Sequence, residues 1–389
     1  MGDAIVSGRP LIDARIRFEN LHQDDKEKDA AATTLRARLG YETGAFQGFT
    51  GLIEFDLLGH VGERRFSDTV HVLPEYPTIP DPDMAVLNRL QLSYGGRLTN
   101  APNDPPDLRI TVGRQRIVFG DARFVGNAPW RQHEQTFDGL LVLNSSLPAT
   151  TLSYAYIDRV NRMFGPDSPI GIYDSHSHLF NAVYSGFLPA LKLESYAYLL
   201  DFDQAPTLST ATYGLRADGF FQLGAGFTAR LNGAFSYQED RADNPFSISL
   251  QHTLTEAGLG YGELTALIGR EVLEGNGTIG FQTPIASPHA FQGWAEVFVT
   301  KPPDGLTDIY AKASYGFPVL PRIGKFTASV AYHDFAAERT DADLGSEWDA
   351  SLDARLNEHF SYSGAFALYD GGSARPDKHV FWLYATYVY

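Results

Sequence analysis

The 389-residue chain contains no cysteine, so it can form neither a disulfide nor a thiolate metal site, and it is suited to an oxidising envelope compartment. It also lacks any apolar run close to the ~20 residues that a transmembrane helix needs, which excludes a helical membrane protein. The opening residues, MGDAIVSGRP, lack the charged and apolar regions of a secretion signal. We therefore expect a mature form from which the signal peptide is absent.

Basic residues are in the minority. Against 31 lysines and arginines stand 47 acidic residues, which gives a net charge of −16. A nucleic-acid-binding protein normally shows a basic balance or a basic block, so we expect no nucleic-acid partner.

Alternation with a period of two dominates the sequence. From Ile12 to Glu19 every second residue is charged and the residues between are apolar. The stretch from Glu347 to Arg355 alternates in the same way, with Ser351 as an uncharged polar residue among the charged ones. Successive side chains of a strand point to opposite faces, so each segment has one apolar and one strongly polar face. An apolar outside around a charged, wet inside is typical of an outer-membrane barrel, whereas the polar face of a soluble sandwich is normally mixed.

Counting these segments predicts an all-β fold, a single-domain antiparallel transmembrane β-barrel of about eighteen strands that spans residues 1–389. An even number returns both termini to the periplasmic side, and short connectors alternate with longer, acidic ones such as HQDDKEKD. The predicted location is the bacterial outer membrane. The expected strands span residues 9–21, 31–43, 47–60, 85–97, 107–119, 133–146, 149–162, 177–187, 190–202, 208–219, 224–238, 247–260, 263–273, 306–316, 323–336, 346–357, 359–370 and 378–389.

The C-terminal strand adds a separate signal. Alternate residues from Phe381 to Tyr389 share one face, and the chain ends in an aromatic. This resembles the terminal strand by which outer-membrane proteins are recognised, so we expect the barrel-insertion machinery as a partner. Outer-membrane lipid and lipopolysaccharide are expected partners too, because divalent cations could bridge the acidic outer loops to the latter.

A barrel of this size leaves an aqueous channel, so the predicted function is transport. We expect no enzyme, because no serine lies in a G-x-S-x-G context, and no cofactor. His176 and His178 could share a strand face, but the sequence offers them no third ligand, and we expect no metal site.

Residues 113–139, GRQRIVFGDARFVGNAPWRQHEQTFDG, resemble the core motif of the alginate-export family of outer-membrane barrels. Residues 289–315, HAFQGWAEVFVTKPPDGLTDIYAKASY, resemble its second signature, and NRMFG at 161–165 fits the strand after the first motif. The resemblance implies an eighteen-stranded barrel with an arginine-lined lumen that passes a polyanionic uronate. It places the following residues in the constriction: Arg114, Arg116, Arg123, Arg131, Asp138, Arg159, Asn161 and Arg162.

The alternation alone adds four neighbours from the first two strands, namely Arg15, Arg17, Arg36 and Arg38. We expect residues 120–131 to form an outer loop that folds into the lumen, anchored by Phe124 and Trp130. An arginine that faces lipid costs about 2–4 kcal/mol at the midplane, so we expect a bulge at Gly113 that turns Arg114 and Arg116 inward.

Two interpretations of these arginines stay open. Guanidinium groups grip carboxylates bidentately, which suits a path for an acidic saccharide or uronate. Alternatively, carboxylates such as Glu54 and Asp56 neutralise the arginines in a structural ladder, and the chain is a general or small-molecule uptake porin. No periplasmic turn is long enough to act as a gate, which favours small solutes over an exported polymer.

Overall fold

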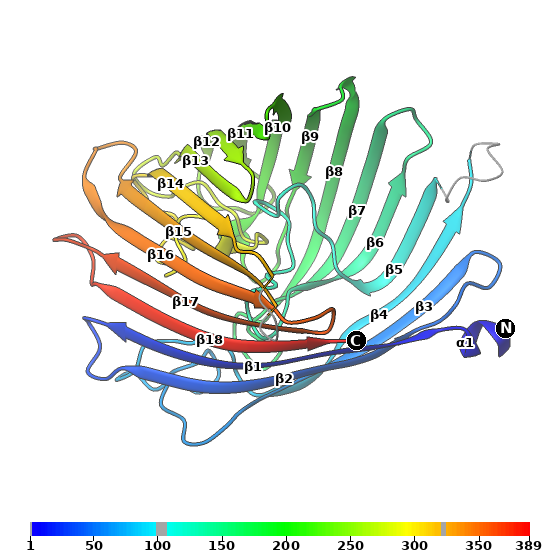
Figure 1. Cartoon of the computed structure of the whole chain (residues 1–389), viewed down its shortest axis with the longest axis horizontal. Coiled ribbons are helices and arrows are strands. Elements are labelled where there is room, and N and C mark those ends of the chain that lie inside the picture. Colours follow the sequence, from blue (N-terminus) through cyan, green and yellow to red (C-terminus); the bar gives the residue numbers. More distant parts are fainter. Residues whose placement is uncertain (1, 99–106, 320–323) are drawn as a thin grey trace.

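The computed structural model describes residues 2–98, 107–319 and 324–389, which form one antiparallel sheet of eighteen strands (Figure 1). The sheet closes on itself because β1 pairs with β2 on one side and with β18 on the other. The predicted closed barrel of eighteen strands is therefore confirmed.

The short helix α1 (Gly2–Val6) precedes the first strand. The strands are β1 (Arg9–Gln23), β2 (Ala30–Glu42), β3 (Phe49–His60), β4 (Met84–Gly96), β5 (Leu108–Gln115), β6 (Thr136–Asn144), β7 (Thr150–Asn161), β8 (Ile172–Leu188), β9 (Leu191–Leu199), β10 (Thr210–Gly224), β11 (Phe227–Asp240), β12 (Ser249–Tyr261), β13 (Leu264–Leu273), β14 (Leu306–Gly316), β15 (Lys325–Ala336), β16 (Asp343–Arg355), β17 (Phe360–Asp370) and β18 (Lys378–Val388). The 3₁₀ turns η1 (Pro206–Leu208) and η2 (Pro288–Ala290) lie in connectors. No helix among these described residues is long and apolar enough to cross a membrane.

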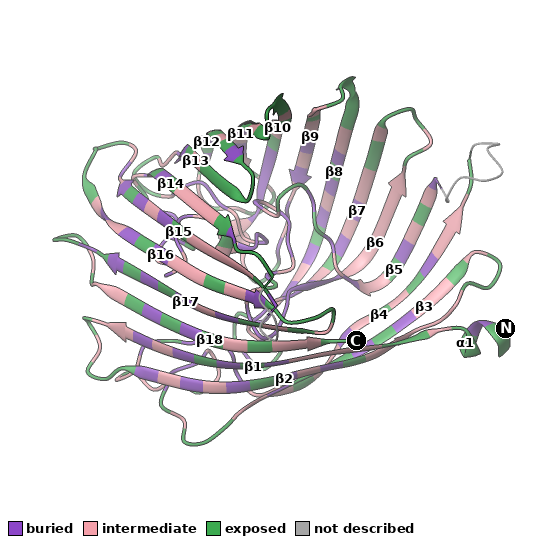
Figure 2. Cartoon of the chain, in the orientation of Figure 1, coloured by how far each residue is buried: buried purple, intermediate pink, exposed green. Residues whose placement is uncertain are grey.

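The alternation of the sequence becomes alternation of exposure along each strand (Figure 2). On β2, Arg36 and Arg38 are buried towards the lumen, whereas Leu35 and Leu39 are exposed on the outer face of the wall. Strand pairing preserves these faces around the barrel, because residues directly opposite each other in an antiparallel pair point to the same side.

The expected and observed strands differ most near the motif around residue 120. β5 ends at Gln115 rather than at 119, and β6 begins at Thr136 rather than at 133. The physical reason is that the intervening residues bind other groups inside the barrel: the Gln132 N–H donates to Asp81 at 3.0 Å, and the Gln135 side chain donates to the Gly126 carbonyl at 2.8 Å. At β8 the difference runs the other way, since the strand begins at Ile172, five residues before the expected start at 177.

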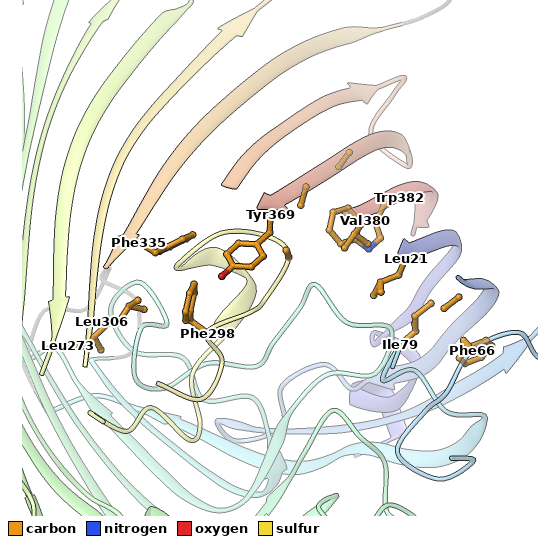
Figure 3. Packing of buried hydrophobic residues seen from close by; sticks show 14 of the residues in the cluster. Leu21, Phe66, Ile79, Leu273, Phe298, Leu306, Phe335, Tyr369, Val380 and Trp382 are labelled. Atoms are coloured by element: carbon orange, nitrogen blue, oxygen red, sulfur yellow. The ribbon is translucent and has the colours of Figure 1, made fainter. Parts of the chain in front are cut away.

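The connectors alternate in length around the barrel. Those on the side of the two termini are short wherever the structure describes them fully, and three on the opposite side are long (residues 61–83, 116–135 and 274–305). Side chains of these long connectors pack inside the wall: Phe66 and Ile79 of the first join a buried cluster with Leu21 of β1, and Phe298 of the last packs against Phe335 of β15 (Figure 3). The interior is therefore partly filled with connecting chain.

Candidate functional site: a lumen narrowed by two inner loops

Two connectors narrow the lumen, and we call them inner loop 1 (residues 116–135, between β5 and β6) and inner loop 2 (residues 274–305, between β13 and β14). They touch each other along their length: Val125 bridges to Ile285, and the Gly126 N–H donates to the Ile285 carbonyl at 2.9 Å. The sequence predicted infolding for residues 120–131 only, and inner loop 2 shares the lumen with them.

Arginines of β1 hold the backbone of inner loop 1. Arg15 donates from Nε to the Gln132 Oε1 at 2.7 Å and from its Nη atoms to the carbonyls of Pro129 and Arg131. Arg17 donates to the Trp130 carbonyl, and its guanidinium lies 4.6 Å from the centre of the Trp130 ring. Both side chains are thereby fixed to the loop.

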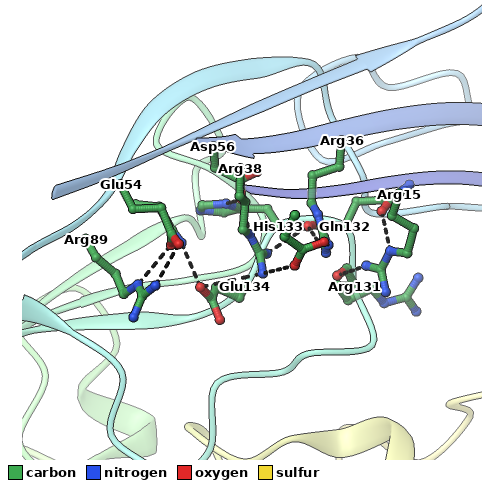
Figure 4. A network of polar contacts seen from close by, with 12 residues as sticks. Arg15, Arg36, Arg38, Glu54, Asp56, Arg89, Arg131, Gln132, His133 and Glu134 are labelled. Carbon is green, nitrogen blue, oxygen red and sulfur yellow. Dashed lines mark hydrogen bonds and ion pairs between the residues drawn. The ribbon is translucent and has the colours of Figure 1, made fainter. Parts of the chain in front are cut away.

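The arginines of β2 bind the same segment (Figure 4). Arg36 and Arg38 donate to the Gln132 carbonyl at 3.4 and 3.0 Å, and Arg38 also pairs with Asp56 at 3.2 Å. Arg36 pairs in addition with Asp13. Arg15, Arg17, Arg36 and Arg38 are each at most 7% exposed, because their guanidinium groups are engaged in tethering inner loop 1.

Glu134 is the acidic centre of this tether. It pairs with Arg116 at 2.6 Å and with Arg38 at 3.6 Å, and it accepts from the Asn88 amide at 2.6 Å. Burial alone would raise the pKa of the Glu134 carboxyl, but Arg38 and Arg116 outweigh it and hold that pKa well below its ordinary value. Glu134 therefore stays ionised and binds the loop to the wall.

Arg116 lies on the lumen side, because it also approaches Glu54, a buried inward-facing residue of β3, at 3.8 Å. Its side chain is 36% exposed, more than that of any β1 or β2 arginine in the tether. Among the predicted constriction residues, Arg116 both pairs within inner loop 1 and keeps part of its side chain exposed on the lumen side.

Arg114 differs from the prediction that a bulge at Gly113 turns it inward. Gly113 has a φ of +106°, yet the pairing of β5 with β4 and with β6 runs without a register shift at this position. Arg114 therefore stays opposite Leu90, which is half exposed on the outer face. Its charge is compensated there by a bidentate pair with Asp138, at 2.7 and 2.9 Å.

The outer face also holds other predicted residues. Asp138 lies opposite Arg159, and Arg159 opposite Asp174, with which it pairs at 2.7 Å. The residues that alternate with them, Phe137 and Val160, are fully buried on the lumen side. A register shift between Ile157 and Arg159 is the reason that Arg159 faces outward while Ile157, two residues earlier on β7, is buried. The expectation that these residues line the constriction is thus not met.

The other two predicted residues, at the end of β7 and just beyond it, make structural contacts. Asn161 donates to Asp138 at 3.1 Å. Arg162 donates to the Ile170 carbonyl at 2.9 Å and to the Tyr173 hydroxyl at 2.7 Å, which fixes the connector between β7 and β8.

Arg123 and Arg131 connect inner loop 1 to its surroundings. Arg123 pairs with Glu271 of β13 at 2.6 Å, and Arg131 pairs with Glu296 of inner loop 2. Both arginines are nearly fully buried. Burial alone would lower the pKa of the Arg131 guanidinium. The Glu296 carboxylate outweighs this effect, with help from other carboxylates, so the pKa is raised.

The two expected anchors pack among aromatic rings. Phe124 lies against Tyr196 and Phe281, with ring centroids 5.4 and 6.0 Å away, and meets the His252 ring edge to face. Trp130 stacks on His289 of inner loop 2. Burial is the main reason that the pKa of His289 falls to about 4, although Glu296 opposes the shift.

Open space lies between inner loop 2 and the part of the wall formed by β9 to β15, away from the arginines of β1 and β2. A cavity of about 750 Å³ is lined by β9 to β15 and carries three cationic side chains, Lys192, Arg230 and Lys312, with one carboxylate, Asp218. Lys312 lies on the same face of β14 as buried Asp308, which places it on the lumen side. Arg230 and Lys312 belong to one cross-strand row of the wall.

Sequence reasoning missed these three cations. Each is a single basic residue on its strand, and each strand comes from a different part of the chain, so no local motif marks them. The available signal was their position on the polar face of an alternating segment, combined with the register that brings the strands together.

A second cavity, of about 430 Å³, lies between the inner loops and β16 to β18. Arg15, Trp130 and His289 border it, together with Asp353 of β16. Trp294 of inner loop 2 borders both cavities.

No family model matches the chain, and no curated protein of similar sequence was found. Solved structures match it over nearly the whole length at low identity. Pseudomonas aeruginosa OpdL is 16% identical with a TM-score of 0.69 and 99% of each chain covered. P. aeruginosa OccK9 (OpdG) is 13% identical with a TM-score of 0.75, covering 99% of this chain and 100% of that one. P. aeruginosa OpdK, solved with vanillate, is 13% identical with a TM-score of 0.73 and 98% of each chain covered. At these identities the matches establish the fold.

Proposed function

We propose that the protein is a channel of the bacterial outer membrane through which small hydrophilic anions diffuse. The observation that carries this proposal is the cavity with Lys192, Arg230 and Lys312 against the single carboxylate of Asp218. The closed wall, apolar outside and polar inside, supports it, as do the matches to outer-membrane channel structures, which are not enzymes.

A small carboxylate is the solute class that fits best. Lysine is a compact, strongly hydrated point charge, so lysines attract an anion while allowing it to leave, as conduction requires. The match to OpdK with vanillate, a small carboxylate, supports the same class. We place Arg116 beside the path and assign the β1 and β2 arginines to holding inner loop 1.

A polymeric uronate is the alternative solute that the resemblance to the alginate-export family implies. That resemblance rests on local motifs, and the inner loops divide the lumen into limited cavities, so we rank the polymer below small anions. A general porin is a second candidate function, favoured by the burial of Arg15, Arg17, Arg36 and Arg38 in structural contacts.

The proposed surroundings follow from the location. Lipid and lipopolysaccharide contact the outer face, and the C-terminal strand ending at Tyr389 engages the barrel-insertion machinery. These partners remain predictions.

The test is the reversal potential of single channels in a planar bilayer under a salt gradient, followed by addition of benzoate or an oligouronate. Anion selectivity with brief blockades by benzoate is expected. Blockade by the oligouronate alone would favour the polymer, and a current without selectivity or blockade would favour a general porin.

A further inference from the structure

The segment of inner loop 2 that carries Trp294 is fastened on both sides of that residue. The Ala295 N–H donates to Glu347 Oε1 of β16 at 2.7 Å, and Lys378 of β18 donates to the Ala295 carbonyl at 2.6 Å. Gln292 donates to Glu271 of β13, so three strands of the wall bind the loop at the residues that flank Gly293 and Trp294.

The turn is also shaped for this contact. Gly293 has a φ of +80°, and a Cβ at this position would overlap the Glu347 carboxylate. Only glycine lets the backbone approach so closely without strain. On the other side of Trp294, Glu296 pairs with Arg131 of inner loop 1, which in turn is close to Glu19 of β1.

The Trp294 side chain packs in part against the buried cluster that includes Phe298, and the rest of it borders open space. It is half-buried, its ring lies 6.1 Å from the ring of His289, and it borders both lumen cavities. The residues that line the first cavity with it include Lys312 and Ala331, and those that line the second include Ser351 and Asp353, all from the wall between β14 and β16. A solute in either cavity therefore meets the same indole.

We propose that Trp294 is the size-selecting residue of the pore, and that Glu347 and Lys378 are positioning residues that hold it across the lumen. This inference rests on the proposed channel function and deepens it by naming the side chain that sets the upper size of the solute. A rigid aromatic ring on a fastened backbone excludes large solutes better than a flexible side chain, because it has few conformations in which to move aside.

The absence of cysteine from the chain makes the test specific. Trp294→Cys can be modified by thiol reagents of increasing size in an otherwise unreactive protein, while single-channel current is recorded. The unmodified variant should conduct on the order of twofold more than the parent, since the indole no longer occupies the pathway, and each larger adduct should lower the current further.

Two matched variants test the positioning role. Glu347→Gln keeps an acceptor for the Ala295 N–H and should conduct like the parent, whereas Glu347→Ala should give a larger, noisier current. Val299→Cys, an exposed position elsewhere in inner loop 2, is the control for labelling, and its adducts should leave the current unchanged.

The outcomes separate the two claims. If the parent carries no current, both the channel and this inference fail. A parental current that Trp294→Cys and its adducts leave unchanged overturns the role of Trp294 alone. Each variant should migrate as a folded barrel in unheated gels, which keeps the comparison valid.

Discussion

The indole of Trp130 and the imidazole of His289 stack face to face, with ring centroids 3.7 Å apart and 5° between their planes. Arg17 lies over the same indole at 4.6 Å, so an arginine of the wall, a tryptophan of inner loop 1 and a histidine of inner loop 2 meet in one group. Each inner loop is thus held by the other as well as by the wall.

Trp130→Ala should therefore loosen both inner loops. A stacked aromatic pair contributes about 0.5–1.5 kcal/mol beyond its buried area, and the cation–π contact adds to that. Amide hydrogen exchange should accelerate in inner loop 2 around residues 287–296, although the substitution lies in inner loop 1. Trp130→Phe keeps part of the stack and should show a smaller effect; equal rates in parent and Trp130→Ala would contradict the coupling.

Docking of inner loop 2 should weaken as the pH falls. Burial, with help from Arg123, lowers the pKa of Lys301 from 10.5 to about 7, so the docked loop binds fewer protons than a free loop between these values. His289, with its pKa lowered from 6.5 to about 4, acts in the same direction over the lower range. As the pH is lowered, inner loop 2 therefore loses docking stability first between pH 10.5 and 7, through Lys301, and again between pH 6.5 and 4, through His289.

A spin label at Val299→Cys would report this change as increasing mobility on acidification. Lys301→Met keeps the length and burial of the side chain without the charge, and it should flatten the response in the upper range only. A label whose mobility rises with pH would contradict the assignment.

Glu134→Gln should destabilise the barrel strongly. It removes the charge that Arg38 and Arg116 share inside the lumen, and breaking a buried pair costs about 3–5 kcal/mol because a charge is left uncompensated. Glu63→Gln is the matched control, since its partner Arg65 is exposed and such pairs contribute about 0–1 kcal/mol. Urea unfolding in detergent micelles compares the two, and similar midpoints would show that the tether is dispensable.

Gly113→Ala should impair folding. The residue has a left-handed φ of +106°, and a Cβ would overlap the Leu90 carbonyl of the neighbouring strand. Gly62→Ala shares the left-handed backbone, with a φ of +89°, but nothing lies within 4 Å of its would-be Cβ. The yield of refolded barrel should drop for the first variant and stay near the parental yield for the second; equal losses would mean that backbone conformation alone matters.

The sequence predicts the wall well because alternation is a local property. Arg36 inward and Leu35 outward follow directly from their order in the chain, and such pairs recur on most strands. Arg114 shows where this reasoning stops: Gly113 suggests a bulge, but its left-handed backbone is accommodated without a register shift, and Asp138 on the adjacent strand neutralises the outward charge.

The interior was harder to predict because it depends on contacts between distant residues. Phe66 and Ile79 lie in a polar connector, and only packing against Leu21 reveals that this connector enters the lumen. Lys192, Arg230 and Lys312 converge only once the six strands from β9 to β14 are in register, and the fastening of inner loop 2 by Glu347 and Lys378 joins residues more than fifty positions apart.

The cationic cavity can be tested through the reversal potential of a variant in which Lys192, Arg230 and Lys312 are all replaced by methionine. Arg159→Gln, which removes a cation from the outer face of the wall, is the control. We expect the triple variant to lose anion selectivity while the control keeps the parental reversal potential. A triple variant as anion-selective as the parent would contradict this expectation, and would assign the cationic cavity no part in the path.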